Sequence, residues 1–343
     1  MSKRTKIRKS DNYLIAAIIL LVTWAFIYHK VSGQNNLTGA WHNFMELIDK
    51  SGFQVEFLIA LLLVFLNWGI EAIKWKFLIA KVEKISFLKS FQAVLTGVSV
   101  STFTPNRIGE YFGRVFILEK AGRIEGILIT ILGSVSQLLI TIMAGATSLL
   151  VFIPLFLRDL PILTGYIYFA LVALVITIDI SLLFFFFNIS QFYNITEKLF
   201  KTRWRRLRRF FLVFTLYSYR DLCRVISLSF FRYLVFSIQY YILLRVFSVP
   251  VTLFNGLIVI AVIFFIMSII PTITLTELGI RGSVALFFFS YYFPNNQTVT
   301  IGILSASALL WAINLALPAL IGSIFVFRLK FFRKTGNLSN SQR

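Results

Sequence analysis

The sequence reads Ser101-Thr-Phe-Thr-Pro-Asn-Arg-Ile-Gly-Glu-Tyr-Phe-Gly-Arg114 within a region that is otherwise apolar enough to lie in a bilayer. This stretch carries three charged side chains, Arg107, Glu110 and Arg114, together with a proline and two glycines. Because Glu110 and Arg114 stand four residues apart, one helical turn places them on the same face. A charge at membrane depth is costly unless it has a partner or a function. The stretch therefore predicts a broken helix with a polar centre.

A second stretch of the same kind lies near the other end of the chain. It reads Pro271-Thr-Ile-Thr-Leu-Thr-Glu-Leu-Gly-Ile-Arg281 and again combines a proline, polar side chains and a glycine near a glutamate. Glu277 and Arg281 repeat the four-residue spacing. The interval from proline to glutamate is one residue longer here, so the second stretch is a partial repeat of the first. Together they predict a polar centre to which both stretches contribute.

Composition places the chain among helical membrane proteins. Its 343 residues are 58% hydrophobic and 14% charged, and the mean hydropathy is +0.83. A soluble domain has about a quarter of its residues charged. We therefore expect an all-α protein, a polytopic bundle of transmembrane helices.

The net charge of +20 does not indicate a nucleic-acid partner, because its distribution follows the membrane. Of the 34 lysines and arginines, 26 fall in segments that we assign to the cytoplasm, three fall outside, and five lie within hydrophobic spans. This asymmetry is the positive-inside rule. It predicts a protein of the cytoplasmic (inner) membrane with both termini in the cytoplasm.

Long apolar segments predict six full spans. Their approximate limits are Tyr13–His29, Phe53–Ile73, Ile124–Ile153, Ile162–Asn188, Arg224–Phe247 and Thr300–Phe327. Between the first two, Lys30–Gly52 has the apolar spacing of a short helix on the outer membrane surface.

Two further apolar segments are interrupted and predict re-entrant hairpins. Residues 91–118 contain a run too short to cross, since crossing takes about 20 residues, and basic segments flank it on both sides. Residues 254–293 are interrupted in the same way, but their flanks carry no such charge. We therefore expect the two hairpins to enter from opposite sides, an inverted arrangement. Paired, Gly/Pro-broken segments of this kind indicate the binding site of a transporter.

The expected domain organisation is simple. Residues 1–12 form a basic cytoplasmic N-terminus, residues 13–332 a single transmembrane domain, and residues 333–343 a cytoplasmic tail. Within the domain, the cytoplasmic loop 189–223 is the most basic segment. Each of its charges near the surface contributes about 1 kcal/mol of attraction to anionic lipid, so we expect this loop to bind the anionic membrane surface.

The charged residues of the two stretches are the candidate substrate-binding residues. Guanidinium groups are well shaped for phosphate, so Arg107, Arg114 and Arg281 would receive a lipid phosphate. Glu110 and Glu277 would hold these arginines, face a cationic headgroup or carry a coupling proton. The alternative is that each pair neutralises itself and joins a broken helix to its neighbours.

Asp179 and Arg232 form a further possible intramembrane ion pair. Both lie about 12–14 Å from the cytoplasmic ends of successive spans, at 1.5 Å per helical residue, so they could meet if the two helices touch. A structural ion pair and a transport role both fit these positions. By contrast, we expect Glu71, near the end of its span, to reach toward the membrane surface.

Other kinds of site lack the residues they require. One cysteine and two histidines predict no metal site, and no Gly-Lys-Ser/Thr phosphate loop or Ser/His/Asp arrangement is present. We therefore expect no cofactor, no catalytic residues and no enzymatic activity.

The first stretch resembles a known family motif. Thr104-Pro-Asn-Arg-Ile-Gly-Glu-Tyr-Phe-Gly-Arg114 is similar to the Pro-Gly-Arg-x-Gly-Glu-x-x-x-Arg pattern of the lysylphosphatidylglycerol synthase transmembrane-region family. The Thr276–Arg281 segment resembles the family's second, glycine-rich motif, and the likeness extends from about Tyr13 to Phe332. This is the flippase-like domain of bifunctional aminoacyl-phospholipid synthases, so the resemblance implies a role in moving lipids.

Three departures limit that inference. Asn106 stands where the family usually has glycine, and Gly282 follows Arg281 where many members have glutamate. Glu277 would then be the acidic partner of Arg281. Too few residues follow Phe332 to form the aminoacyl-transferase domain, so the resemblance implies lipid movement without lipid synthesis.

We therefore expect a flippase that moves a phospholipid or a polyprenyl-phosphate-linked lipid between leaflets. The alternatives are a membrane glycosyltransferase that uses Glu46 and Asp49 on the outer face, and a scaffold for other envelope proteins. The sequence leaves the lipid, the driving force and the oligomeric state open.

Overall fold

The structure is a computed structural model that describes residues 53–102, 104, 107–156, 165–191, 212–271, 274–294 and 296–326. These residues form helices and turns and contain no strand, as the composition predicts. The helices are α3 (Phe53–Ile79), α4 (Phe87–Ser101), α5 (Gly109–Val115), α6 (Arg123–Phe156), α7 (Tyr166–Phe187), η3 (Leu212–Leu216), α10 (Tyr219–Val246), α11 (Leu253–Ile269), α12 (Thr274–Ser290), α13 (Gln297–Trp311), η4 (Ala312–Ala316) and α14 (Leu317–Val326).

Five segments among the described residues are long and apolar enough to cross a membrane. They are α3, α6, α7, α10 and the continuous segment Thr298–Val326, in which the π-helical η4 joins α13 to α14. These segments confirm the all-α, polytopic fold. The expected first span and the surface helix before α3 lie outside the described residues.

The first predicted hairpin is formed by α4 and α5, which have only 15 and 7 residues. Ser86 caps the start of α4 by accepting a hydrogen bond from the backbone N–H of Lys89 at 3.2 Å. At the break, Thr104 Oγ1 accepts from the backbone N–H of Gly109, the first residue of α5, at 2.7 Å. Arg107 has a positive φ of 57°, an uncommon conformation for a side chain other than glycine. The turn therefore holds the backbone of Arg107 in a strained orientation.

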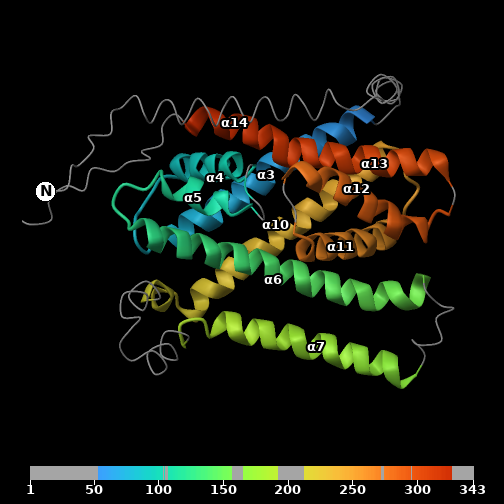
Figure 1. The fold of residues 1–343 in the computed structure, drawn as a ribbon, viewed down its shortest axis with the longest axis horizontal. Helices are drawn as coiled ribbons and strands as arrows, with labels where there is room; N and C mark the ends of the chain where they lie inside the picture. Colours follow the sequence, from blue (N-terminus) through green and yellow to red (C-terminus); the bar gives the residue numbers. More distant parts are fainter. Residues whose placement is uncertain are drawn as a thin grey trace, which may run out of the picture.

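The second predicted hairpin is formed by α11 and α12, each of 17 residues. Thr252 caps α11 by accepting from the backbone N–H of Asn255, and the helix ends just before Pro271. A proline lacks the N–H that would continue the helix, which favours a break there. Figure 1 shows α4 and α5 toward one end of the bundle and α11 and α12 toward the other. The two hairpins thus lie toward opposite ends of the bundle, and their entry from opposite sides of the membrane stays a prediction.

Small residues allow these elements to approach closely. A Cβ atom added at Gly113 of α5 would lie 2.7 Å from Cα of Gly97 in α4. One added at Gly322 of α14 would overlap the carbonyl group of Leu95 in α4. Such contacts hold membrane helices together by close van der Waals packing, since lipid gives no hydrophobic force between them. The α4 helix of the first hairpin therefore packs closely against α14.

Candidate functional site

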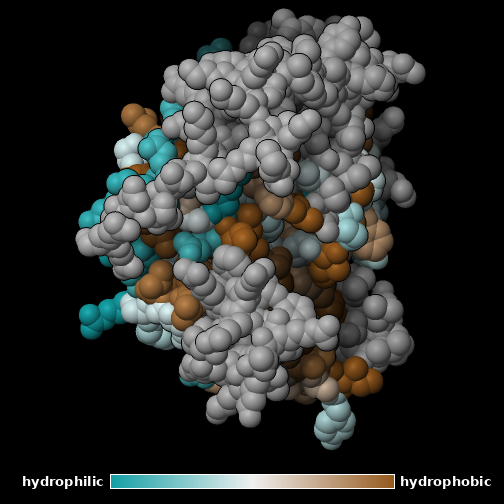
Figure 2. Space-filling view, turned by 60° about the vertical axis from the view of Figure 1, so that its left-hand side comes forward, coloured by the Kyte–Doolittle hydropathy of each residue, from teal (hydrophilic) through white to brown (hydrophobic). Residues whose placement is uncertain are grey.

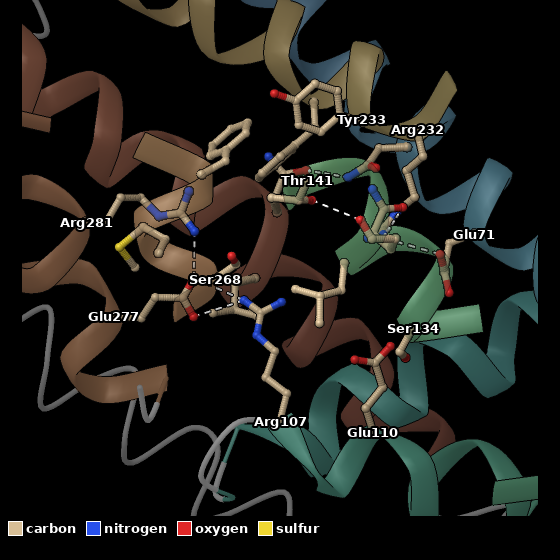
Figure 3. Close-up of a pocket in the computed structure, with 18 of the residues that line it drawn as sticks. Glu71, Arg107, Glu110, Ser134, Thr141, Arg232, Tyr233, Ser268, Glu277 and Arg281 are labelled. Atoms are coloured by element: carbon tan, nitrogen blue, oxygen red, sulfur yellow. Dashed lines mark hydrogen bonds and ion pairs between the residues drawn. The ribbon is translucent and has the colours of Figure 1, made fainter. Parts of the chain in front are cut away.

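A cavity of about 630 Å³ lies where the broken hairpins meet the long helices. We call it the central cavity; its walls come from α3, α5, α6, α10, α11, α12 and the α13–η4 segment, together with the break before α5. Figure 3 shows Arg107 and Arg281 converging on Glu277 on one side, with Arg232 and Glu71 on the other. The volume is in the range of pockets that hold small molecules.

Glu277 is the centre of the first ionic group. Its carboxylate accepts from Arg107 Nη2 at 3.0 Å and from Arg281 Nη2 at 2.6 Å. The contact with Arg281 is the predicted pair within one helical turn. The contact with Arg107 joins the break of the first hairpin to the start of α12. The two broken stretches therefore share one ionic group.

Glu71 is the centre of a second ionic group that the sequence reasoning missed. It contacts Lys74 at 2.9 Å, Arg114 at 2.8 Å and Arg232 at 3.3 Å. The expectation that Glu71 reaches the membrane surface is wrong: the residue is 4% exposed, because α3 continues to Ile79. The signal was available, since Glu71 and Lys74 stand three residues apart and thus share a helix face.

Lys74 anchors three helices around this second group. Besides Glu71, its ammonium donates to the carbonyl of Gly133 in α6 at 3.1 Å and to Ser229 Oγ in α10 at 3.3 Å. The ammonium group has three hydrogens, and each of them has one of these three partners. Lys74 therefore supplies positive charge to the cavity without a donor left for a ligand.

Arg114 forms the predicted pair with Glu110, but it lies behind the cavity wall. The side chain of Arg114 binds both Glu110 and Glu71. The residue is 3% exposed and is not among those that line the cavity, whereas Arg107, Glu110, Glu277 and Arg281 are. A ligand in the cavity would therefore not contact Arg114 directly. Arg114 holds the two carboxylates in place.

The predicted ion pair between Asp179 and Arg232 is wrong. Arg232 Nη1 binds Glu71 at 3.3 Å and donates to Gln137 Oε1 at 3.3 Å. Asp179 lies on α7, which occupies the edge of the bundle beside α6 (Figure 1), and its buried Oδ1 has no hydrogen-bond partner in the structure. Asp179 and Arg232 are at similar distances from the predicted cytoplasmic ends of their helices, but the side chain of Arg232 is directed into the bundle toward α3 and α6.

Two arginines of the central cavity keep donors without a partner. Nε and Nη1 of Arg281 are buried and make no hydrogen bond, and neither does the buried Nε of Arg232. Arg281 lies over the ring of Phe264 at 5.9 Å and Arg232 over the ring of Trp68 at 5.3 Å, distances that allow cation–π attraction. Both arginines line the cavity, and guanidinium N–H groups without a partner can bind an oxyanion.

Part of the cavity wall reaches the apolar outer surface of the bundle. Leu138 of α6 and Ile269 at the end of α11 line the cavity and are 43% and 60% exposed. Figure 2 shows hydrophilic and hydrophobic residues side by side on the described part of one face. A ligand with a charged head and an apolar tail would meet both kinds of surface here.

The described residues give no sign of other site chemistry. Among them, no group of three or more His, Cys, Asp or Glu side chains could hold a metal ion. Glu46 and Asp49, on which the glycosyltransferase alternative depends, lie outside the described residues. The ionic groups of the central cavity are therefore the site to which the described structure gives most support.

Comparison with known proteins identifies the family of this chain. Neither the curated proteins nor the solved structures include a match to this chain. The family model described as lysylphosphatidylglycerol synthase TM region matches residues 13–329. This match covers both broken stretches and all the helices described here. The chain is therefore a multipass membrane protein that belongs to the lysylphosphatidylglycerol synthase transmembrane-region family.

Proposed function

We propose that this protein moves a lipid with a phosphate-containing head, a phospholipid or a polyprenyl-phosphate-linked lipid, between the two membrane leaflets. The observation that carries the proposal is a cavity in which arginines with free buried donors lie beside a wall open to the apolar surface. A site for a soluble anion would need the arginines but no apolar wall beside them. The adjacent apolar wall at Leu138 and Ile269 suits a ligand whose tail stays in the bilayer.

The ionic group around Glu277 suggests how a head would be received. Glu277 occupies one N–H group of Arg281 and one of Arg107. A lipid phosphate that bound Arg281 would compete with Glu277 for these arginines and weaken the link between the hairpins. The link would form again once the head left. In this scheme the ion pair between Arg107 and Glu277 opens and closes with each transport cycle.

The proposed orientation places the first hairpin at the cytoplasmic side of the inner membrane. Basic residues gather at that end of the bundle, in the α3–α4 turn, before α6 and at the start of α10. The opposite hairpin ends at the uncharged segment after Ser290. The positive-inside rule then puts both termini in the cytoplasm. The proposal includes no chemical reaction.

A leaflet-exposure assay tests the proposal. Purified protein would be placed in vesicles containing a fluorescent phospholipid, and the fraction of lipid quenched from outside would be followed with time. We expect wild-type protein to speed the exchange between leaflets and Arg281→Gln to abolish most of that gain. Arg245→Gln is the matched control, because Arg245 is exposed, pairs with Glu56 at 3.5 Å and does not line the cavity. Equal exchange rates for wild-type protein, both variants and protein-free vesicles would overturn the proposal.

A further inference from the structure

The charges around the central cavity do not cancel. Three carboxylates, those of Glu71, Glu110 and Glu277, face five cations, which are Lys74, Arg107, Arg114, Arg232 and Arg281. Arg114 lies behind the cavity wall and joins the cluster through Glu71 and Glu110, and the other seven are the charged residues among the described ones that line the cavity. The cluster therefore carries a formal excess of two positive charges.

The excess is divided between the two sides. Glu277 is shared by Arg107 and Arg281, which leaves one positive charge on the α12 side. On the α3 side, Glu71 and Glu110 together face Lys74, Arg114 and Arg232, which leaves another.

Each side also has an unpaired buried donor, at Arg281 on the α12 side and at Arg232 on the α3 side. These two arginines lie on opposite sides of the same cavity (Figure 3). An uncompensated charge away from water is unfavourable, so this arrangement favours an anion that can neutralise both sides at once.

We infer that the lipid head taken by this cavity carries two negative charges on phosphate. Such a head is a phosphate monoester in its dianionic form or a diphosphate with one ester at each end. A phosphodiester head such as that of phosphatidylglycerol carries one charge and would leave one cation uncompensated. A zwitterionic head has no net charge and would leave both excess positive charges uncompensated. This inference rests on the proposed function, because it names the class of lipid for the same site.

Binding to purified wild-type protein tests the charge preference. The probes are phosphatidic acid, phosphatidylglycerol and phosphatidylethanolamine with identical acyl chains, and inorganic phosphate as the head without a tail. We expect phosphatidic acid to bind about ten-fold more tightly than phosphatidylglycerol, since it adds one charge next to the second arginine. Inorganic phosphate should bind more weakly than phosphatidic acid. Equal affinity for the two anionic lipids would overturn the inference, and tighter binding of inorganic phosphate would show a soluble anion as the ligand.

The pH dependence gives a second measurement that needs no variant. The second ionisation of a phosphate monoester has a pKa of about 6. Between pH 5 and pH 8, the affinity for phosphatidic acid should rise relative to that for phosphatidylglycerol, which keeps one charge throughout. A constant ratio across this range would contradict the inference.

Variants show which side chain causes the preference for phosphatidic acid over phosphatidylglycerol. Arg281→Gln should reduce the ten-fold preference to less than three-fold, and Arg281→Lys, which keeps the charge, should retain more of it than Arg281→Gln does. Arg245→Gln should leave it unchanged. If the vesicles show Arg281-dependent movement of all phospholipids without preference, the proposed function stands and this inference fails. If phosphatidic acid binds as expected but no lipid changes leaflet, the inference stands and the transport function fails.

Discussion

Arg107 donates to both carboxylate oxygens of Glu277, at 3.2 and 3.0 Å, although 170 residues separate the two in the chain. Arg107 belongs to the break between α4 and α5, and Glu277 to the first turn of α12. Each hairpin thus contributes one partner to a single ion pair. The contact makes the two broken stretches one site, which neither stretch could form alone.

This contact can be tested by cross-linking. Cys223 is the only cysteine, so Cys223→Ser gives a background without thiols. In that background, Arg107→Cys combined with Glu277→Cys should be joined efficiently by a short bifunctional thiol reagent, because the two side chains meet in the cavity. The control pair, Arg107→Cys with Arg245→Cys, should remain unlinked. Similar yields for both pairs, measured by mass spectrometry, would show that the hairpins do not meet.

The second ionic group predicts a large difference in stability between two glutamates of α3. Glu71→Gln removes the carboxylate shared by two buried cations, Lys74 and Arg114, and the half-buried Arg232, and it should lower the free energy of unfolding by about 3 kcal/mol. Glu56→Gln breaks only the exposed pair with Arg245, at 3.5 Å, and should change it by less than about 1 kcal/mol. Thermal unfolding of the two purified variants in the same detergent measures the difference. Equal losses would contradict the central position of Glu71.

Helix packing predicts opposite effects for two glycine substitutions. Gly322→Ala places a Cβ atom against the carbonyl of Leu95, and we expect the overpacking to cost about 1–3 kcal/mol. Gly69, in the interior of α3, has open space: apart from its chain neighbours and the helix's own backbone, no atom lies within 4 Å of a Cβ added there. Gly69→Ala should be neutral or stabilise the protein by about 0.5–1 kcal/mol, because alanine favours the helix. Melting temperatures that fall equally in both variants would show that α14 does not pack closely on α4.

Glu83, in the turn between α3 and α4, predicts a dependence of stability on pH. Burial alone would raise its pKa, but hydrogen bonds from the backbone N–H groups of Ala121, Glu119 and Lys120 and the nearby Lys89 outweigh this and lower the pKa. Because the folded-state pKa lies below the unfolded value, the carboxylate contributes stability above the ordinary glutamate value of about 4.3. That contribution is lost as the pH falls through the folded-state pKa.

Melting curves at several pH values check this expectation. Wild-type protein should melt at a higher temperature than Glu83→Gln at pH 7. The difference should shrink as the pH falls below about 4. A difference that stays constant down to pH 3 would show that the ionised form of Glu83 does not hold the segment before α6.

Much of the fold follows from local features of the sequence. Apolar length predicts the long helices, and the short apolar runs on either side of each proline predict the two pairs of shorter helices, α4 with α5 and α11 with α12. The pairs of Glu110 with Arg114 and of Glu277 with Arg281 also follow, since each lies within one helical turn.

The contacts between distant segments do not follow in the same way. Counting residues gives the position of a side chain along the axis of its helix. The direction in which the side chain points around that axis depends on which neighbouring helices pack against it, and the sequence does not show this. Asp179 and Arg232 match in depth, yet Arg232 binds Glu71. Glu71 itself was missed because Lys74 resembles the start of a cytoplasmic loop, whereas α3 continues to Ile79 and buries both residues.

The central claim is that a lipid head enters the cavity formed by the two hairpins. The most direct measurement uses a phospholipid that carries a photoactivatable group next to its phosphate, irradiated with the protein in vesicles and followed by peptide mapping. We predict labelling of the cavity wall at Ile269–Pro271 and at Leu138, which Arg281→Gln strongly reduces and Arg245→Gln does not. Labelling confined to the outer face of α7, with none in the cavity, would contradict the account.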